Sequence, residues 1–220
     1  MSSGYFEVLD KEERDPAKLF PSFSMYENMK KGTNIKIDNI TKKLGTDANT
    51  IKIVKNFLSE KEIEWLLSAW LEKEKNIISN ENLNKINILV NEIKQNVIIK
   101  GEELFGFSLK EDDSINTPHN ETFYILRRHE NFVTDIHCDN FGDNKNTTYL
   151  WNGYLASLIY LNDNYSGGEL YFPEHNLTVK PEKGMLIAFP GNFFNRHGIF
   201  PAIGDGRFAM SIFLKFKDFE

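Results

Sequence analysis

The spacing of apolar residues divides the chain into a helical part and a strand-rich part. From residue 59 to residue 104 the apolar positions recur every three or four residues, as in amphipathic helices. The pattern predicts one helix over residues 59–75 and a second over residues 81–104. Ser59 and Glu62 form a capping-box sequence at the start of the first helix. We expect both helices to cover one side of a sheet and to carry no functional residue.

After Gly106 the apolar residues alternate with polar ones or form short runs, which is typical of strands. The segments that fit this pattern are residues 122–129, 154–162, 169–172, 177–180, 185–189 and 207–216. Turn sequences rich in Gly, Pro, Asn and Asp separate the later ones. Short strands that follow one another through turns are typical of a sandwich or barrel. The sequence therefore predicts an α+β protein, mainly β with flanking helices, whose strands form a jelly roll over about residues 107–220.

The strand predicted over residues 207–216 has two faces of different character. One face is wholly apolar, and we expect it to pack against the helices: Phe208, Met210, Ile212, Leu214 and Phe216. The other face begins with Arg207 and continues with mostly small or polar residues, as expected where a strand lines a cavity that binds an anion. The same alternation places Tyr160 on one face with Tyr154, Ala156 and Leu158. Tyr160 is therefore a candidate to offer a hydroxyl to that anion.

Composition and charge narrow the class of protein. A chain of 220 residues has the length of a single domain, and its formal charge of -6 disfavours binding to nucleic acid or to anionic membranes. One cysteine cannot form an internal disulfide, and no segment resembles a signal peptide or membrane span, so we expect a cytoplasmic, reducing location. Residues 1–50 lack a sustained pattern. We assign them as an arm of unclear role, and residues 51–220 as the functional domain.

The candidate chemistry lies in two short segments of the strand-rich part. His137 and Asp139 stand two positions apart, and His197 follows sixty positions after His137. Two imidazoles and one carboxylate are the ligand set of the facial triad that holds Fe(II) and leaves other coordination positions open. A structural zinc site would normally be closed by four Cys or His ligands, which this set does not supply. Arg207 follows His197 by ten residues and is placed to neutralise an anionic molecule beside the metal.

Other polar residues have competing interpretations. His119 and Glu121 have the same His-X-acid form as the triad, but they precede the strand that leads to His137 and so lie at its wrong end. Glu174 and His175 follow Pro173 in a predicted hairpin, where we expect both to be solvated. Arg127 and Arg128 are surface charges or substrate or oxoacid ligands; alternation lets only one of them face the cavity, and we favour Arg128.

Five sequence blocks have a recognisable order and spacing. They are residues 160–163 (YLND), 167–173 (GGELYFP), 181–190 (PEKGMLIAFP), 197–198 (HG) and 206–208 (GRF). With these blocks the chain, from about residue 51 to residue 216, resembles the Fe(II)/2-oxoglutarate dioxygenases, and within them the prolyl 4-hydroxylase-like group. The resemblance implies a double-stranded β-helix with His137 and Asp139 at the end of an early strand and His197 on a late one.

The same resemblance implies roles for the residues around the metal. Arg207, assisted by Tyr160, would hold the distal carboxylate of 2-oxoglutarate, and Phe213 would stand at the pocket wall. Glu121 corresponds to an acidic residue that faces the substrate in the hydroxylases. Arg128 occupies a position at which the family commonly has a tyrosine that helps to bind the oxoacid, and we assign it to the cofactor site.

The resemblance also implies an activity. Fe(II), 2-oxoglutarate and O2 are the expected cofactors, with ascorbate as a candidate reductant, and decarboxylation of the oxoacid is coupled to hydroxylation of an unactivated C–H bond. The first predicted substrate is a peptidyl proline, so the expected partner is a proline-containing peptide or protein. Two alternatives stay open. One is hydroxylation of a free amino acid, small metabolite or nucleobase, and the other is a jelly-roll module that binds a metal or ligand without turnover.

Overall fold

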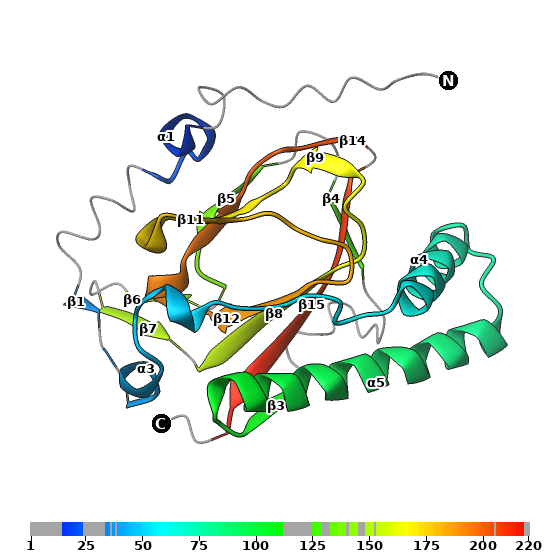
Figure 1. Cartoon of the computed structure of the whole chain (residues 1–220), viewed down its shortest axis with the longest axis horizontal. Coiled ribbons are helices and arrows are strands. Elements are labelled where there is room, and N and C mark those ends of the chain that lie inside the picture. Colours follow the sequence, from blue (N-terminus) through cyan, green and yellow to red (C-terminus); the bar gives the residue numbers. More distant parts are fainter. Residues whose placement is uncertain are drawn as a thin grey trace.

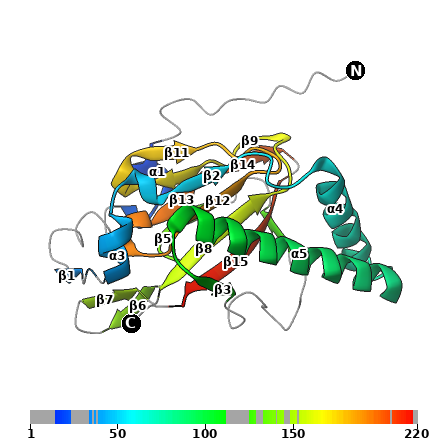
Figure 2. The ribbon, with the colours of Figure 1, turned by 60° about the horizontal axis from the view of Figure 1, so that its bottom comes forward.

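Two β-sheets face each other, and two helices cover the outer face of the larger sheet (Figures 1 and 2). The computed structural model describes residues 15–23, 34–35, 37, 39–111, 125–128, 133–139, 141–144, 148–151, 153–204 and 206–217. This arrangement is the predicted double-stranded β-helix with flanking helices. Within the described residues, no helix is both long and apolar enough to span a bilayer.

The strands of the described residues form four sheets. The larger sheet has the order β2 (Lys52–Val54), β12 (Leu186–Pro190), β8 (Tyr154–Tyr160), β15 (Arg207–Phe216) and β3 (Leu109–Glu111), and β4 (Leu126–Arg128) also pairs with β15. The smaller facing sheet has the order β11 (Leu177–Val179), β10 (Leu170–Phe172), β13 (His197–Ile199) and β5 (Thr134–His137). The remaining strands are β14 (Ala202–Gly204) with β9 (Tyr165–Gly167), and β1 (Asn34–Ile35) with β7 (Thr148–Trp151) and β6 (Phe141–Asn144).

The helical elements are α1 (Pro16–Leu19), α3 (Asn39–Leu44), α4 (Glu60–Glu74) and α5 (Asn80–Phe105). The part of the chain that the structure describes also has three short 3-10 turns: η1 (Ala48–Thr50), η3 (Pro173–His175) and η4 (Phe193–Asn195). The two long helices lie where the sequence predicts them. At the start of α4 the Ser59 hydroxyl accepts the Glu62 N–H at 3.3 Å, and the Glu62 carboxylate accepts the Ser59 N–H at 2.7 Å, which is the predicted capping box.

The predicted division of β15 into two faces is confirmed. Met210, Ile212 and Leu214 are buried in the helix-side cluster, the group of apolar side chains between the larger sheet and helices α4 and α5. Ala209 and Phe213 point the other way and pack in the interior cluster between the two sheets. Burial of large apolar side chains stabilises the fold by about 1.5–3 kcal/mol each. The alternation therefore fixes which face of the strand lines the cavity.

An ion pair fastens α5 to the edge of the larger sheet. Lys94 of the helix lies 2.5 Å from Glu111 at the end of β3, and both side chains are largely buried. Burial of either charge without the other would cost free energy, because an unpaired charge is poorly solvated inside a protein. The pair therefore fixes the position of the helix against the sheet. The helices thus serve as a rigid support, as expected from their sequence.

The described part of the amino-terminal segment packs against the outer face of the smaller sheet. Phe20, which follows α1, is only 1% exposed and contacts Tyr171 and Phe200. Further along, β1 pairs in parallel with β7. The sequence pattern gave no sign of these contacts, since each joins residues far apart in the chain.

Several short strands were not predicted. β9, β13 and β14 have three residues each, too few to show alternation, and β6 and β7 are rich in Asn, Asp and Thr. These strands form through pairing with partners that the sheet supplies. Of the strand predicted over residues 122–129, β4 is observed, and residues 122–124 and 129 lie outside the described part.

Candidate active site

Strands β5 and β13 bring the two candidate histidines together. The strands are antiparallel neighbours, and His137 is the direct register partner of His197. The centroids of the two imidazole rings are 4.5 Å apart. His137 is the last residue of β5 and His197 is the first residue of β13, so two residues sixty positions apart in the chain lie side by side.

Asp139 completes the group. It follows β5 by two residues, and its carboxylate oxygens lie 3.5 Å from His137 Nε2 and 3.7 Å from His197 Nε2. One ligand atom from each of the three residues lies within 4.8 Å of the others. The side chain of His197 is 3% exposed and that of Asp139 is 13% exposed, whereas that of His137 is 38% exposed. The cluster is therefore buried on one side and open on the other, as a metal site that admits a second molecule requires.

Backbone hydrogen bonds set the tautomer of both histidines. Nδ1 of His137 lies 2.8 Å from the carbonyl oxygen of Asp135, and Nδ1 of His197 lies 3.1 Å from that of Asn195. Because a carbonyl oxygen can only accept, each Nδ1 carries a proton. In the neutral rings the lone pair is then on Nε2, which faces Asp139. Both imidazoles are thus prepared to bind a metal through Nε2.

The electrostatics of the cluster favour metal-binding protonation states. Burial lowers the pKa of His197 to about 4, against the opposing effect of the Asp139 carboxylate. For Asp139, burial alone would raise the pKa, but the neighbouring His197 and His137 lower it below its usual value. His197 is therefore a neutral ligand and Asp139 a charged one at neutral pH. Burial, with the Asp139 charge next, raises the pKa of the Cys138 thiol to about 12, so the Cys138 thiol stays protonated at neutral pH.

The metal-free protein is expected to lose stability as the pH falls from 7 to 5. His197 takes up a proton near pH 6.5 in the unfolded chain but only near pH 4 in the folded protein, so protons favour unfolding in this window. The stability is fully present above about pH 6.5, and about 1–2 kcal/mol of it is lost by pH 5. Urea unfolding at the two pH values measures the loss. The variant His197→Gln should lose less over the same window, and an equal loss in both proteins would contradict the prediction.

Arg207 and Tyr160, the two residues predicted to bind an anion, lie next to each other in the interior of the protein. Arg207 is 2% exposed, and its guanidinium carbon lies 5.5 Å from the centroid of the Tyr160 ring. Burial raises the pKa of Tyr160, and the charge of Arg207 partly offsets this rise. Among the described residues, neither the Tyr160 hydroxyl nor Nη1 of Arg207 has a hydrogen-bond partner of normal geometry. Two buried donors without acceptors suit the carboxylate of a bound molecule.

Tyr165 of β9 is a residue that the sequence did not suggest. Its hydroxyl is also buried and, within the described part of the chain, has no hydrogen-bond partner. Burial raises its pKa, and the Arg207 guanidinium counters that effect, which places the hydroxyl within the field of the same charge. Tyr165 lies five residues after Tyr160 in the sequence. The alternation of residues along a strand could not predict that its side chain lies near Arg207.

Of the remaining predicted residues, the structure describes some side chains and not others. Phe213 packs in the interior cluster with the cavity-facing side of β15. The backbone of Arg128 pairs with that of Arg207, but its side chain lies outside the described part. Arg127 points to the helix side, where its guanidinium lies over the rings of Trp70 and Phe208. Glu121, like His119, lies outside the described residues.

The expectation that Glu174 and His175 are solvated is wrong. Glu174 forms an ion pair with Arg196, whose side chain is 1% exposed, and the Glu174 side chain is itself 10% exposed. His175 Nε2 lies 3.1 Å from the side-chain oxygen of Asn195. The turn η3 folds back onto η4, next to His197, because the buried guanidinium requires a carboxylate partner. Local sequence could not show this, since the partners are about twenty positions apart.

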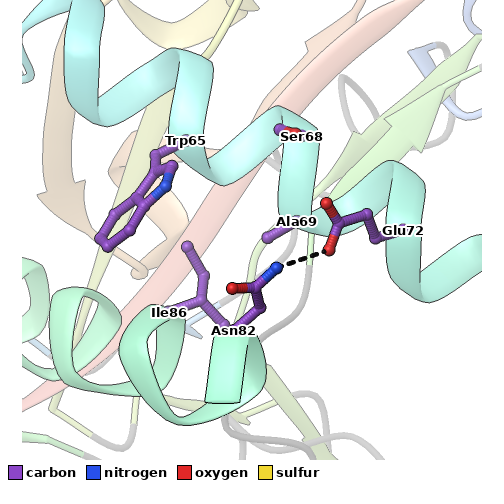
Figure 3. Close-up of a pocket in the computed structure, with 6 residues that line it drawn as sticks. All are labelled: Trp65, Ser68, Ala69, Glu72, Asn82 and Ile86. Atoms are coloured by element: carbon purple, nitrogen blue, oxygen red, sulfur yellow. Dashed lines mark hydrogen bonds between the residues drawn. The ribbon is translucent and has the colours of Figure 1, made fainter. Parts of the chain in front are cut away.

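A small pocket between α4 and α5 has no part in this site (Figure 3). It is lined by residues of the two helices, among them Trp65 and Ile86, and a hydrogen bond of 3.2 Å joins Asn82 to Glu72 across it. Its volume of about 30 Å³ has room for a water molecule but not for an oxoacid. The pocket is a feature of the helix contact.

The predicted cofactors fit the residues that line the cavity. Two Nε2 atoms and a carboxylate match Fe(II), and the unpaired donors of Arg207 and Tyr160 match an oxoacid carboxylate. Similarity to known proteins points the same way. Residues 123–215 match the model of the 2OG-Fe(II) oxygenase superfamily.

One relative and two solved structures show where the chain is similar to known proteins. The chain is 34% identical over 89 residues to human (Homo sapiens) prolyl 3-hydroxylase 3, a match that covers 35% of this chain and 12% of the relative. The viral collagen prolyl hydroxylase of Paramecium Bursaria Chlorella virus-1, solved as a 2OG complex, has a TM-score of 0.54 at 15% identity over 76% of this chain and 96% of its own. A Pseudomonas putida prolyl-4-hydroxylase has a TM-score of 0.51 at 15% identity over 81% and 97% of the two chains.

The family model, the relative and the solved structures all point to oxygenases. At such low identity the solved structures show a shared fold, while the sequence match covers the strands that carry the histidines and Arg207. The match to the human relative is short and spans about an eighth of that protein's length. The matched residues, the fold and the cluster of His137, Asp139 and His197 agree with one another: over residues 123–215 the chain is similar to the 2OG-Fe(II) oxygenase superfamily.

Proposed function

We propose that the chain is an Fe(II)- and 2-oxoglutarate-dependent hydroxylase that acts on a prolyl residue of a peptide or protein. The observation that carries the oxygenase part is the approach of His137, Asp139 and His197 to within 4.8 Å of one another. The buried Arg207 supports it, because its charge acts on His197 and so belongs to the same cavity. The choice of a prolyl residue as the substrate is supported by the similar proteins, which are prolyl hydroxylases.

Each residue of the cavity has a role in this proposal. His137, Asp139 and His197 would hold Fe(II), and Arg207 with Tyr160 would hold the distal carboxylate of 2-oxoglutarate. When bound, iron and oxoacid supply the oxidative decarboxylation with O2 that yields succinate, CO2 and a hydroxylated product. The rings of Phe189 and Phe172, with centroids 4.8 and 5.6 Å from that of His197, would exclude water from the buried side of the metal.

The open side of the cavity is where we place the substrate. The exposed part of the His137 side chain shows that this side is accessible. Phe213 would form part of the wall beside the oxoacid, while Arg128 and Glu121 would contact the oxoacid and the substrate, respectively. A peptide suits an open cavity because only the reacting residue must enter it. Position 4 of the proline ring is the expected site of hydroxylation, and position 3, as in the name of the human relative, is the alternative.

Succinate formation from 2-oxoglutarate tests the proposal. The protein is supplied with Fe(II), ascorbate and a proline-rich peptide, and the matched control is the same peptide with alanine in place of proline. We expect turnover to rise with the proline peptide alone, and amino-acid analysis of the product then distinguishes 3- from 4-hydroxyproline. Turnover that neither peptide changes would contradict the prolyl substrate and favour a small molecule. Absence of turnover in metal-loaded protein would favour a binding module.

A further inference from the structure

The residues that precede β2 contact the two backbone positions on which the candidate metal-binding histidines depend. Those positions are Asp135 and Asn195, whose carbonyl oxygens accept the Nδ1 protons of His137 and His197. Each is held from outside the jelly roll by a different part of the segment of residues 15–50. From its sequence, this segment was assigned only as part of an arm of unclear role.

Thr50, at the end of η1, holds Asn195. The Thr50 hydroxyl lies 2.8 Å from the side-chain oxygen of Asn195 and 2.8 Å from the carbonyl oxygen of Asp47. Thr50 is 2% exposed and Asn195 is 1% exposed, so water does not compete for the contact. The Asn195 amide in turn donates to Asn192 at 3.0 Å. The side chain of Asn195 is thus fixed from two directions, and its carbonyl is fixed with it.

Ser22 and Phe20 hold Asp135. The backbone N–H of Ser22 donates to the Asp135 carboxylate, at 3.1 and 3.2 Å from its two oxygens. The Phe20 ring packs on Ile136, between Asp135 and His137, and on Tyr171 and Phe200. These contacts bind the amino-terminal segment to β5 at the residues immediately before His137.

Phe20 also reaches the other metal-bearing strand. Gly198 follows His197 on β13, and a Cβ atom at this position would lie 2.8 Å from Cε1 of Phe20. The ring therefore occupies the place that a side chain at position 198 would need. One aromatic residue of the segment spans the two strands from which His137 and His197 come.

We propose that residues 20–22 and Thr50 are positioning residues of the metal site: Thr50 through Asn195, and Phe20 and Ser22 through Asp135, hold the two imidazoles in the orientation that binds the metal. The inference rests on the metal ligands of the proposed function and is independent of the substrate. Groups that orient metal-binding histidines typically change metal affinity by about 10- to 100-fold when they are removed. Since Thr50 acts through Asn195, we expect the lower end of that range.

Cobalt binding to the metal-free full-length protein tests the Thr50 contact. Co(II) stands in for Fe(II), and its visible absorption reports the ligand geometry. Thr50→Val removes the hydroxyl at nearly constant shape and should weaken Co(II) binding about 10-fold and shift the absorption bands. Thr50→Ser keeps the hydroxyl and should restore both. Thr46→Val, at an exposed threonine of the same segment, is the matched control and should behave as the wild type.

Phe20→Ala tests the other contact, and Phe107→Ala controls for general loss of stability. Phe107 packs in the helix-side cluster against Phe216, away from β5 and β13. Phe20→Ala should weaken Co(II) binding and shift its bands, whereas Phe107→Ala should lower the melting temperature without changing the bands. Wild-type affinity and spectrum in Thr50→Val, or equal spectral effects of the two phenylalanine variants, would overturn the inference. Failure of the wild-type protein to bind Co(II) would instead overturn the metal site itself.

Discussion

Asp139→Ala is expected to abolish succinate formation, with or without a peptide. The variant leaves two imidazoles to hold the metal and removes the negative charge that partly balances Fe(II). In the metal-free protein Asp139 lies 3.5 and 3.7 Å from the two Nε2 atoms, and it is the carboxylate within reach of both among the described residues. No neighbouring group there could replace it. The measurement is 2-oxoglutarate turnover at saturating Fe(II), together with the affinity for Co(II).

Two further variants separate loss of the ligand from loss of the fold. Asp139→Asn keeps the size of the side chain but not its charge, and it should also be inactive. Asp163→Ala removes an exposed carboxylate that accepts the Lys183 N–H at 3.1 Å, and it should keep its turnover. The far-ultraviolet circular dichroism of all three should match that of the wild type. Turnover retained in Asp139→Ala would remove Asp139 from the ligand set.

The sequence predicted the elements whose pattern is local. In helices α4 and α5 the apolar residues recur at helical spacing over fifteen or more residues. In β15 apolar and polar residues alternate over ten residues, which is long enough to separate its two faces. The candidate ligands could be named because His197, Arg207 and the sequence blocks around them accompany the His137-X-Asp139 pair, which alone would also occur by chance. The residue types therefore predicted a metal site.

The contacts that orient the site could not be predicted in the same way. The pairing of β5 with β13, the ion pair of Glu174 with Arg196 and the packing of Phe20 on Gly198 join residues that the chain separates widely. Each depends on which surfaces meet when the sheets close, and a single sequence has no local signal for this. Phe20 looked like part of an unpatterned segment, although it is among the most buried aromatic residues.

The difference has a physical origin. Ligand atoms must be of a definite chemical type, so the sequence shows them directly. The supporting contacts need only a backbone carbonyl, a backbone N–H or an aromatic surface, which almost any sequence can supply. The hydrogen bonds from Nδ1 of His137 and His197 to carbonyl oxygens two residues before them are of this kind. The ligands of a site can therefore be predicted from the sequence, whereas the residues that position those ligands are found only in the structure.

Arg207→Ala is expected to weaken the binding of 2-oxoglutarate by about 2–5 kcal/mol, which corresponds to roughly 30- to 5,000-fold in affinity. The guanidinium is 2% exposed and lies against the Tyr160 ring, so a carboxylate bound there would be desolvated and would lose its counter-charge. Displacement of 2-oxoglutarate from Co(II)-loaded protein measures the effect without turnover. The affinity for Co(II) itself should change little, because Arg207 is not among the three candidate ligands.

Matched variants make the Arg207 prediction specific. Arg127→Ala removes a guanidinium from β4, the strand paired with the start of β15, but on the helix side over Trp70 and Phe208, so 2-oxoglutarate should bind as in the wild type. Tyr160→Phe removes a neutral donor and should cost only about 0.5–1.5 kcal/mol. Arg207→Lys keeps the charge without the two-pronged donor geometry and should fall between the wild type and the alanine variant. If Arg207→Ala binds 2-oxoglutarate as tightly as Arg127→Ala does, the buried guanidinium serves the fold and the oxoacid is held elsewhere.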